Sequence, residues 1–218
     1  MKSLALIRHG QSVHHVKGLI GGWADFELTS LGKHQAACLA GRLKGEVGDS
    51  CCRLHCSDLK RARQTAAIIG RALGVRPEPH AELREIGAGV VEGKTEAEAR
   101  QQYIAPTEPL LDWQPHPGAE TWRKGYGRVC ACVERLVEKP GDWLVLVTHK
   151  IPVHFVVAWW LGLDIERQSS VFFQADPASL TVLRLEEWGG HTVERLNDTA
   201  HLCGPGMAQG NSGLDKGG

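Results

Sequence analysis

The 218-residue sequence lacks an excess of charge, because 25 Lys and Arg residues balance 25 Asp and Glu residues. A balanced chain offers no electrostatic argument for a nucleic-acid partner or for an acidic membrane surface. No apolar run approaches the roughly 20 residues of a membrane span. The apolar run between Lys2 and Arg8 is also too short for a signal peptide. We therefore expect a cytoplasmic protein that binds neither nucleic acid nor membrane.

The sequence also lacks a disulfide framework. Its seven cysteines are odd in number and include no Cys-x-x-Cys pair. The densest group, CCRLHC at residues 51–56, could suggest a metal cluster. As a strand, however, it separates Cys51 from Cys52 and Cys56, which lie on the opposite face. We favour small buried cysteines there and expect no metal ion or other cofactor in the protein.

The strongest local signal lies in the first ten residues. Leu4–Ile7 is an apolar run that fits a strand buried on both faces of a parallel sheet, and Arg8, His9 and Gly10 follow it. Open α/β sheets bind their ligands at the carboxyl ends of such strands. An Arg and a His together at that edge make an anion site that contains a nucleophile. Alone, the tripeptide is only suggestive, since roughly a few per cent of chains this long contain it by chance.

Strands and helices alternate along the rest of the chain. The predicted strands are 4–7, 51–56, 81–84, 143–147, 180–185 and 192–196. The predicted helices are 29–42 with Thr29 as N-cap, 57–73 with Ser57 as N-cap, 96–103, 119–138 and 152–161. Residues 11–26 form a long loop, which in a compact domain is usually functional.

This alternation predicts an α/β fold, a three-layer α/β/α sandwich with a central, mostly parallel sheet. We expect one domain over residues 1–203. A small insertion at about 87–117, rich in proline, is expected to cover the site, and the glycine-rich segment 204–218 is expected to be a disordered tail.

Five chemistry-bearing residues are expected at one edge of that sheet. Two predicted strands end in histidine, at His9 and His149, and Glu85 follows a third. Arg61 lies in the first turn of a helix, where the amino terminus attracts anions, and Arg8 precedes His9. Arginines hold phosphate oxygens by paired hydrogen bonds, a neutral imidazole attacks phosphorus, and a carboxyl handles the proton of the leaving group. The set therefore predicts phosphoryl chemistry.

Six stretches, in the same order along the chain, resemble the histidine phosphatase superfamily, which also contains the cofactor-dependent phosphoglycerate mutases. They are IRHGQS (7–12), GWADFELTSLGKHQA (22–36), SDLKRARQTA (57–66), LREIGAGVVEG (83–93), HPGAET (116–121) and VTH (147–149). Together the stretches cover the chain from its start to about residue 196. One such match could be accidental, whereas six in order identify the chain as a member.

The resemblance implies a role for each of the five residues. His9 would be the nucleophile that becomes phosphohistidine, while Arg8, Arg61 and His149 would hold the phosphoryl oxygens. Glu85 would protonate the leaving alkoxide and then deprotonate the attacking water, a role that needs a raised pKa. The arginines supply the positive charge, so no metal is required. The resemblance thus implies a metal-independent histidine acid phosphatase-type phosphomonoesterase that hydrolyses a small phosphorylated metabolite.

Further substrate contacts are expected from the first loop and from the residue after the second catalytic histidine. These candidates are Gln11, Ser12, His15, Gly21, Gly22, Trp23 and Lys150. Two of them depart from the family, which usually has Asn in place of His15 and Gly in place of Lys150. We expect protonation of His15 to make phosphate binding depend on pH near neutrality. Lys150 points its ammonium either toward the site or to solvent, and drift at tolerant positions is the alternative for both residues.

Two other functions remain as alternatives, a phosphoglycerate mutase and a non-catalytic phosphate-binding module. The sequence is also compatible with a homodimer. The mutases of the family share a Tyr and a Lys after the catalytic Glu, where this chain has Ala88 and Glu96, and an Asn where it has Ile151. Glu96 would repel the anion that the Lys attracts. A non-catalytic phosphate-binding module would have no use for the nucleophile His9 or the poised acid Glu85. We therefore favour the phosphatase.

Overall fold

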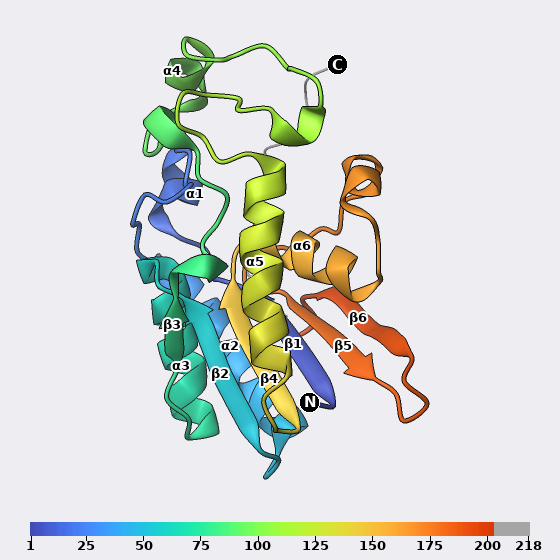
Figure 1. Cartoon of the computed structure of the whole chain (residues 1–218). Coiled ribbons are helices and arrows are strands. Elements are labelled where there is room, and N and C mark those ends of the chain that lie inside the picture. The colour runs from blue at the N-terminus through green and yellow to red at the C-terminus, as the bar shows by residue number, and fades with distance from the viewer. Residues whose placement is uncertain (203–218) are drawn as a thin grey trace.

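The computed structural model describes residues 1–202, with the backbone alone at 167–169, so the expected tail at 204–218 lies outside the described residues. Its centre is a six-stranded sheet in the order β3-β2-β4-β1-β5-β6 (Figure 1). The strands are β1 (Ser3–Arg8), β2 (Cys52–Ser57), β3 (Glu78–His80), β4 (Trp143–Thr148), β5 (Leu180–Leu185) and β6 (His191–Asp198). The first four strands run parallel to one another. At one edge β5 pairs antiparallel with β1, and β6 pairs antiparallel with β5.

Helices cover both faces of the sheet, which confirms the predicted three-layer α/β sandwich (Figure 1). The main helices are α2 (Ser30–Val47), α3 (Lys60–Leu73), α5 (Trp122–Val137) and α6 (Lys150–Trp160). Because strand side chains alternate, Ala5 and Ile7 of β1 pack with α2 and α3, while Leu4 and Leu6 pack with α5 and α6. Among residues 1–202, none of the helices has both the length and the apolar character needed to cross a bilayer.

The central pair of strands sets the position of the site. Every residue of β4 is buried, as expected of a parallel strand with helices on both sides. Its ladder with β1 pairs Ile7 with Val147 and Arg8 with Thr148. The next residue of each strand therefore leaves the sheet at the same carboxyl edge.

Short elements occupy the segments that carry the chain over this edge. They are α1 (Val13–Lys17), α4 (Glu96–Arg100) and the 3-10 turns η1 (Ala81–Leu83), η2 (Gly89–Val91), η3 (Leu110–Asp112) and η4 (Ile165–Ser170). Figure 1 shows the segment that contains η2, α4 and η3 above the carboxyl edge, as expected of the insertion.

Three local predictions were wrong. The loop 11–26 contains the short helix α1, and the strand predicted at 81–84 is the 3-10 turn η1, with β3 lying just before it. The buried hydroxyl of Thr148 donates to Leu83 O at 2.6 Å and holds that turn against β4. Ser57 is not the N-cap of α3, which begins at Lys60; its hydroxyl accepts instead from Leu59 N.

Two glycines let the start of α2 approach the backbone beside His9. A Cβ on Gly32 would lie 1.9 Å from Gln11 O, and a Cβ on Gly10 would lie 2.4 Å from Gly32 O. Both contacts are with backbone atoms, which cannot turn aside as a flexible side chain does. The helix and the loop that follows β1 are therefore in contact only because these side chains are absent.

We predict that Gly32→Ala lowers the free energy of unfolding by about 3 kcal/mol, the upper range for overpacking a tight contact. Gly41 lies on the same helix with nothing within 4 Å of its would-be Cβ. Gly41→Ala should therefore raise stability by about 0.5–1 kcal/mol through helix propensity alone. Urea denaturation of both variants measures the two effects, and equal effects would contradict the close approach.

Candidate active site

His9 lies at the centre of the site and is only 2% exposed. Its Nδ1 is 2.7 Å from Gly10 O. Because a carbonyl can only accept, the proton lies on Nδ1 and the lone pair on Nε2. Arg61 Nε donates to that Nε2 at 3.2 Å. Burial, followed by the charge of Arg61, lowers the pKa of His9 well below its ordinary value, so the ring is neutral.

The first loop fixes Arg61 through two carbonyls. Arg61 Nη1 donates to Ala24 O and Nη2 to Gly22 O, each at 2.8 Å. Burial lowers the pKa of Arg61 to about 10, so the buried guanidinium is still a cation at neutral pH. Gly22 has a φ of +45°, and a Cβ there would lie 2.8 Å from Glu92 Oε1. The glycine is thus needed to aim its carbonyl at Arg61.

Arg8 is held from the other side of His9. Its Nη1 donates to Ala175 O at 2.8 Å, and its Nη2 lies 2.8 Å from Nε2 of His15. The buried Nε of Arg8 has no hydrogen-bond partner among the described residues. The His15 ring stacks on that of His9 with centroids 5.5 Å apart and planes inclined by 9°. His15 therefore lies beside both Arg8 and His9, and its contact with substrate stays a prediction.

The expected titration of His15 near neutrality is wrong. Burial, followed by the charge of Arg8, lowers the pKa of His15 to about 2. The ring is therefore neutral across the physiological range. As a neutral ring it faces Ser12 N with Nδ1, at 3.2 Å, and Arg8 with Nε2, and it contributes no positive charge of its own.

His149 completes the ring of basic groups around His9. It is fully buried, and its ring centroid lies 5.0 Å from that of His9. Its Nε2 is 2.8 Å from the hydroxyl of Ser57, and its buried Nδ1 has no partner among the described residues. Burial, followed by the charge of Arg61, lowers the pKa of His149 well below its ordinary value. The site thus combines three neutral imidazoles, those of His9, His15 and His149, with two guanidinium cations.

The Glu85 carboxyl lies at the amino terminus of α6. Its Oε1 accepts from Ile86 N at 3.0 Å and from Ile151 N at 3.3 Å, and its Oε2 accepts from Lys150 N at 3.2 Å. Burial raises the pKa of Glu85 above its ordinary value, although these N–H groups and the charges of Arg61 and Arg8 act in the opposite direction. A half-buried carboxyl with a raised pKa is suited to general acid catalysis.

The segment that carries Glu85 is held by Trp23, which the sequence predicted as a substrate contact, and by Arg128 and Glu120, which it did not reveal as functional. Arg128 Nη2 donates to Glu85 O at 3.2 Å and forms an ion pair with Glu120 at 2.6 Å. Glu120 also accepts from Gly87 N at 3.2 Å. Trp23 Nε1 donates to Glu85 O at 2.7 Å. Of the stretches that carry the family resemblance, HPGAET contains Glu120 and the stretch at 22–36 contains Trp23, whereas Arg128 lies in none of them.

Other predicted substrate contacts are engaged within the first loop. Gln11 Oε1 accepts from the Thr29 hydroxyl at 2.8 Å, and the Ser12 hydroxyl lies 2.6 Å from His14 Nδ1. A Cβ on Gly21 would lie 2.9 Å from His14 Nε2. These residues shape the loop that holds Arg61, and their direct contact with substrate stays a prediction.

A cavity of about 620 Å³ opens beside the site. Ile86 and Gly87, which directly follow Glu85, form one wall, and Ile20, which precedes Gly21, forms another. The remaining lining is Ala88, Val91, Leu110, Leu111, Trp113, Pro115, His116, Glu120, Trp122, Ser170, Val171 and Phe172. The ammonium of Lys150 lies 5.3 Å from the ring centroid of Phe172, so this side chain reaches the cavity wall.

The fold and the site together define an α/β protein of phosphoryl chemistry, because buried cations, neutral imidazoles and one raised carboxyl meet at the carboxyl edge of a parallel sheet. The chain belongs to the histidine phosphatase superfamily, branch 1, whose family model matches residues 4–199. This match confirms the resemblance that the six sequence stretches indicated.

Individual relatives cover nearly the whole chain. Phosphoserine phosphatase 1 of Hydrogenobacter thermophilus is 30% identical over 209 residues, which are 93% of this chain and 95% of that protein. The protein named Probable phosphoglycerate mutase GpmB of Yersinia enterocolitica is 29% identical over 217 residues, 95% of this chain and 98% of that protein. The solved mycobacterial glucosyl-3-phosphoglycerate phosphatase has a TM-score of 0.76 and 26% identity, covering 92% of this chain and 100% of its own.

The family and its phosphatase members confirm that the chain is a hydrolase of the phosphatase kind, acting on a small phosphorylated compound. The mutase alternative is the weaker one.

We predict that His15→Asn leaves the shape of the pH profile of kcat/KM unchanged across roughly pH 5.5–8.5, the range in which an ordinary histidine titrates. The buried ring is neutral throughout, since its pKa is lowered to about 2. Initial rates with p-nitrophenyl phosphate measure the profile, and His34→Asn, on the exposed face of α2, is the matched control. A step near neutrality that vanishes only in His15→Asn would show that this ring does titrate.

Proposed function

We propose that the protein hydrolyses a phosphate monoester with an apolar body through a phosphohistidine intermediate on His9. The observation that carries this proposal is the neutral His9 ring, whose Nε2 lone pair faces a fixed guanidinium instead of a carboxylate. The Nε2 lone pair attacks phosphorus once Arg61 Nε exchanges its hydrogen bond with His9 for one with a phosphate oxygen, and the charge of Arg61 attracts that phosphate.

In the first step, Nε2 of His9 forms a bond to phosphorus while the ester P–O bond breaks. The Glu85 carboxyl gives its proton to the departing alkoxide and becomes a carboxylate. Arg8 and Arg61 hold the equatorial oxygens, and the unpartnered Nδ1 of His149 gains a partner from one of them. The hydrogen bond from His9 Nδ1 to Gly10 O stabilises the positive charge that develops on the imidazole.

In the second step, water attacks the phosphohistidine. The Glu85 carboxylate takes a proton from the water, the new P–O bond forms, and the P–N bond breaks. The electron pair returns to Nε2 of His9, inorganic phosphate leaves, and Glu85 is again a carboxylic acid. The cycle therefore balances without a metal ion or another reactant.

The cavity supports an apolar leaving group. Leu110, Val171 and Phe172 are 46%, 43% and 45% exposed and converge on it. Exposed apolar side chains gathered around one cavity usually mark a binding surface for an apolar ligand. None of the described residues that line it is Lys or Arg. Among the described residues, the ammonium of Lys150, which reaches the wall at Phe172, is a cation that lies near this lining, and a second phosphate or carboxylate of the kind that a phosphoglycerate mutase holds would have to use it.

We predict that His9→Gln abolishes turnover and that Glu85→Gln lowers kcat about 10²–10⁴-fold for an alkyl phosphate. With p-nitrophenyl phosphate, the first-turnover burst of p-nitrophenol should be slowed much less, because that leaving group needs no proton, whereas hydrolysis of the phosphohistidine still needs the Glu85 base. Glu96→Gln, an exposed carboxyl on α4, is the matched control. Quenched incubation with ³²P-labelled substrate should give an acid-labile, base-stable label on His9. Full activity of His9→Gln, or a label elsewhere, would contradict the mechanism.

We predict that Leu110→Asn lowers kcat/KM about tenfold for 1-naphthyl phosphate, which is the scale of one lost apolar contact. The same variant should hydrolyse glycerol phosphate at the parent rate, because that body is too small and polar to use the cavity wall. Leu185→Asn changes a similarly exposed leucine on β5, far from the cavity lining, and should alter neither rate. Interconversion of 2- and 3-phosphoglycerate faster than phosphate release would overturn the phosphatase assignment.

A further inference from the structure

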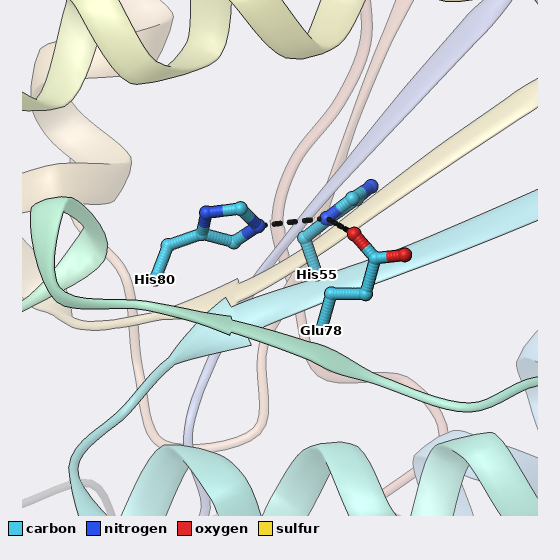
Figure 2. Close-up of side chains that lie close together, drawn as sticks. All are labelled: His55, Glu78 and His80. Carbon is cyan, nitrogen blue, oxygen red and sulfur yellow. Dashed lines mark hydrogen bonds and ion pairs between the residues drawn. The ribbon is translucent and has the colours of Figure 1, made fainter.

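A second cluster of chemistry-bearing side chains lies away from His9, at the edge of the sheet formed by β2 and β3. Figure 2 shows His55, Glu78 and His80 pointing toward one another. His55 is almost fully buried, His80 is half-buried, and the Glu78 side chain is exposed. None of the three belongs to the site described above.

The strand register brings these three residues together. β2 and β3 run parallel, with His55 opposite Glu78 and Ser57 opposite His80. Side chains two apart on a strand share a face, so Glu78 and His80 lie on the face that His55 occupies. The alternation predicted for residues 51–56 puts Leu54 and Cys56 on the other face, in the core beside α2 and α3. The cluster therefore lies on the side of the sheet that α5 covers.

The distances match those of a bound transition metal. His55 Nδ1 lies 2.9 Å from His80 Nε2 and 3.4 Å from Glu78 Oε2. All three residues offer ligand atoms within 4.8 Å of one another. In a tetrahedral zinc site with Zn–N and Zn–O bonds of about 2.0–2.2 Å, neighbouring ligand atoms are separated by about 3.3–3.5 Å. The cluster reaches that geometry with shifts of a few tenths of an ångström for the two printed pairs.

We propose that His55, Glu78 and His80 form a binding site for a zinc-class divalent transition metal ion. Two imidazoles and one carboxylate are ligands that Zn²⁺ prefers, and a fourth position is open to water. In the unbound protein the two facing nitrogens share one hydrogen-bonding proton. The ion replaces that proton, and the ring that carried it adopts its other tautomer.

The surroundings provide access and do not occupy the ligands. A cavity of about 240 Å³ is lined by His55 and Glu78. Arg53 also lines this cavity, but its Nη2 donates to Leu136 O and Lys139 O, each at 2.9 Å. Arg76 and Lys139 line the same cavity, so the negative charge of Glu78 is what favours a cation at the two imidazoles.

A neighbouring set of three residues is less suitable. Glu82 and Cys132 also offer ligand atoms within 4.8 Å of His80. However, Glu82 already pairs with Arg135 at 3.0 Å. Burial raises the pKa of the Cys132 thiol to about 11, so it is protonated at neutral pH and is a poor ligand. The set with His55 is therefore the one we assign.

The test is zinc titration of the full chain, carrying no polyhistidine tag, by isothermal calorimetry, with visible absorption of the Co²⁺ form as a second readout. We expect one ion per chain. Glu78→Gln and His80→Ala should each weaken binding at least about tenfold, because a direct ligand matters no less than the outer partners whose loss costs roughly 10–100-fold. Both substitutions are on an edge strand, and urea denaturation checks that each variant is folded.

Two further variants test whether zinc binds at other residues instead. His34→Ala removes another surface histidine, which lies 3.9 Å from the thiol of Cys38 on α2, and should bind zinc as the parent does. Cys132→Ser should also bind as the parent does. The proposal is overturned if the parent binds no zinc, if Glu78→Gln and His80→Ala both keep the parent affinity, or if binding is lost in His34→Ala or Cys132→Ser instead.

Discussion

The register between β1 and β4 is the constraint on which the site depends. Arg8 pairs with Thr148 in a parallel ladder, so His9 and His149 leave adjacent strands at the same edge and their rings lie 5.0 Å apart. A slip of one residue would exchange the faces on which the β1 side chains pack and would separate the two imidazoles. The two apolar layers on either side of the sheet, which hold alternate residues of β1, therefore also hold the catalytic geometry.

The electrostatics of the site follow from burying two cations, Arg8 and Arg61, that form no ion pair within 4.0 Å among the described residues. Arg61 donates to two loop carbonyls and to His9, and Arg8 donates to Ala175 O and contacts His15. Carbonyl dipoles offset only part of the cost of burying a charge. The neutral histidines add no negative charge, so an anion is the ligand that completes the balance. The same surroundings explain why His9 stays unprotonated and nucleophilic where a surface histidine would titrate.

The sequence was sufficient for the fold, because apolar runs and the residues that end them are local signals. It also predicted that the five candidates meet at one edge, although Glu85 follows the 3-10 turn η1 and not the strand expected there. The sequence could not predict contacts between segments that lie far apart along the chain. Ser57 looked like a helix cap, yet its hydroxyl lies beside His149, 92 residues along the chain. The lowered pKa of His15 depends on burial against Arg8, which no loop pattern reports. His80 carried no signal at all, because its approach to His55 results from the pairing of β2 with β3.

The position of Glu85 fits the proposed use of one carboxyl first as acid and then as base. Burial raises its pKa, while the charges of Arg61 and Arg8 and the N–H groups at the start of α6 oppose that rise. A phosphate dianion bound by those two arginines cancels the charges that favour the carboxylate, so substrate binding itself raises the pKa of Glu85 further. The acid form is thus favoured when the leaving group needs a proton. Once that proton has gone, the α6 N–H groups stabilise the carboxylate that must activate water.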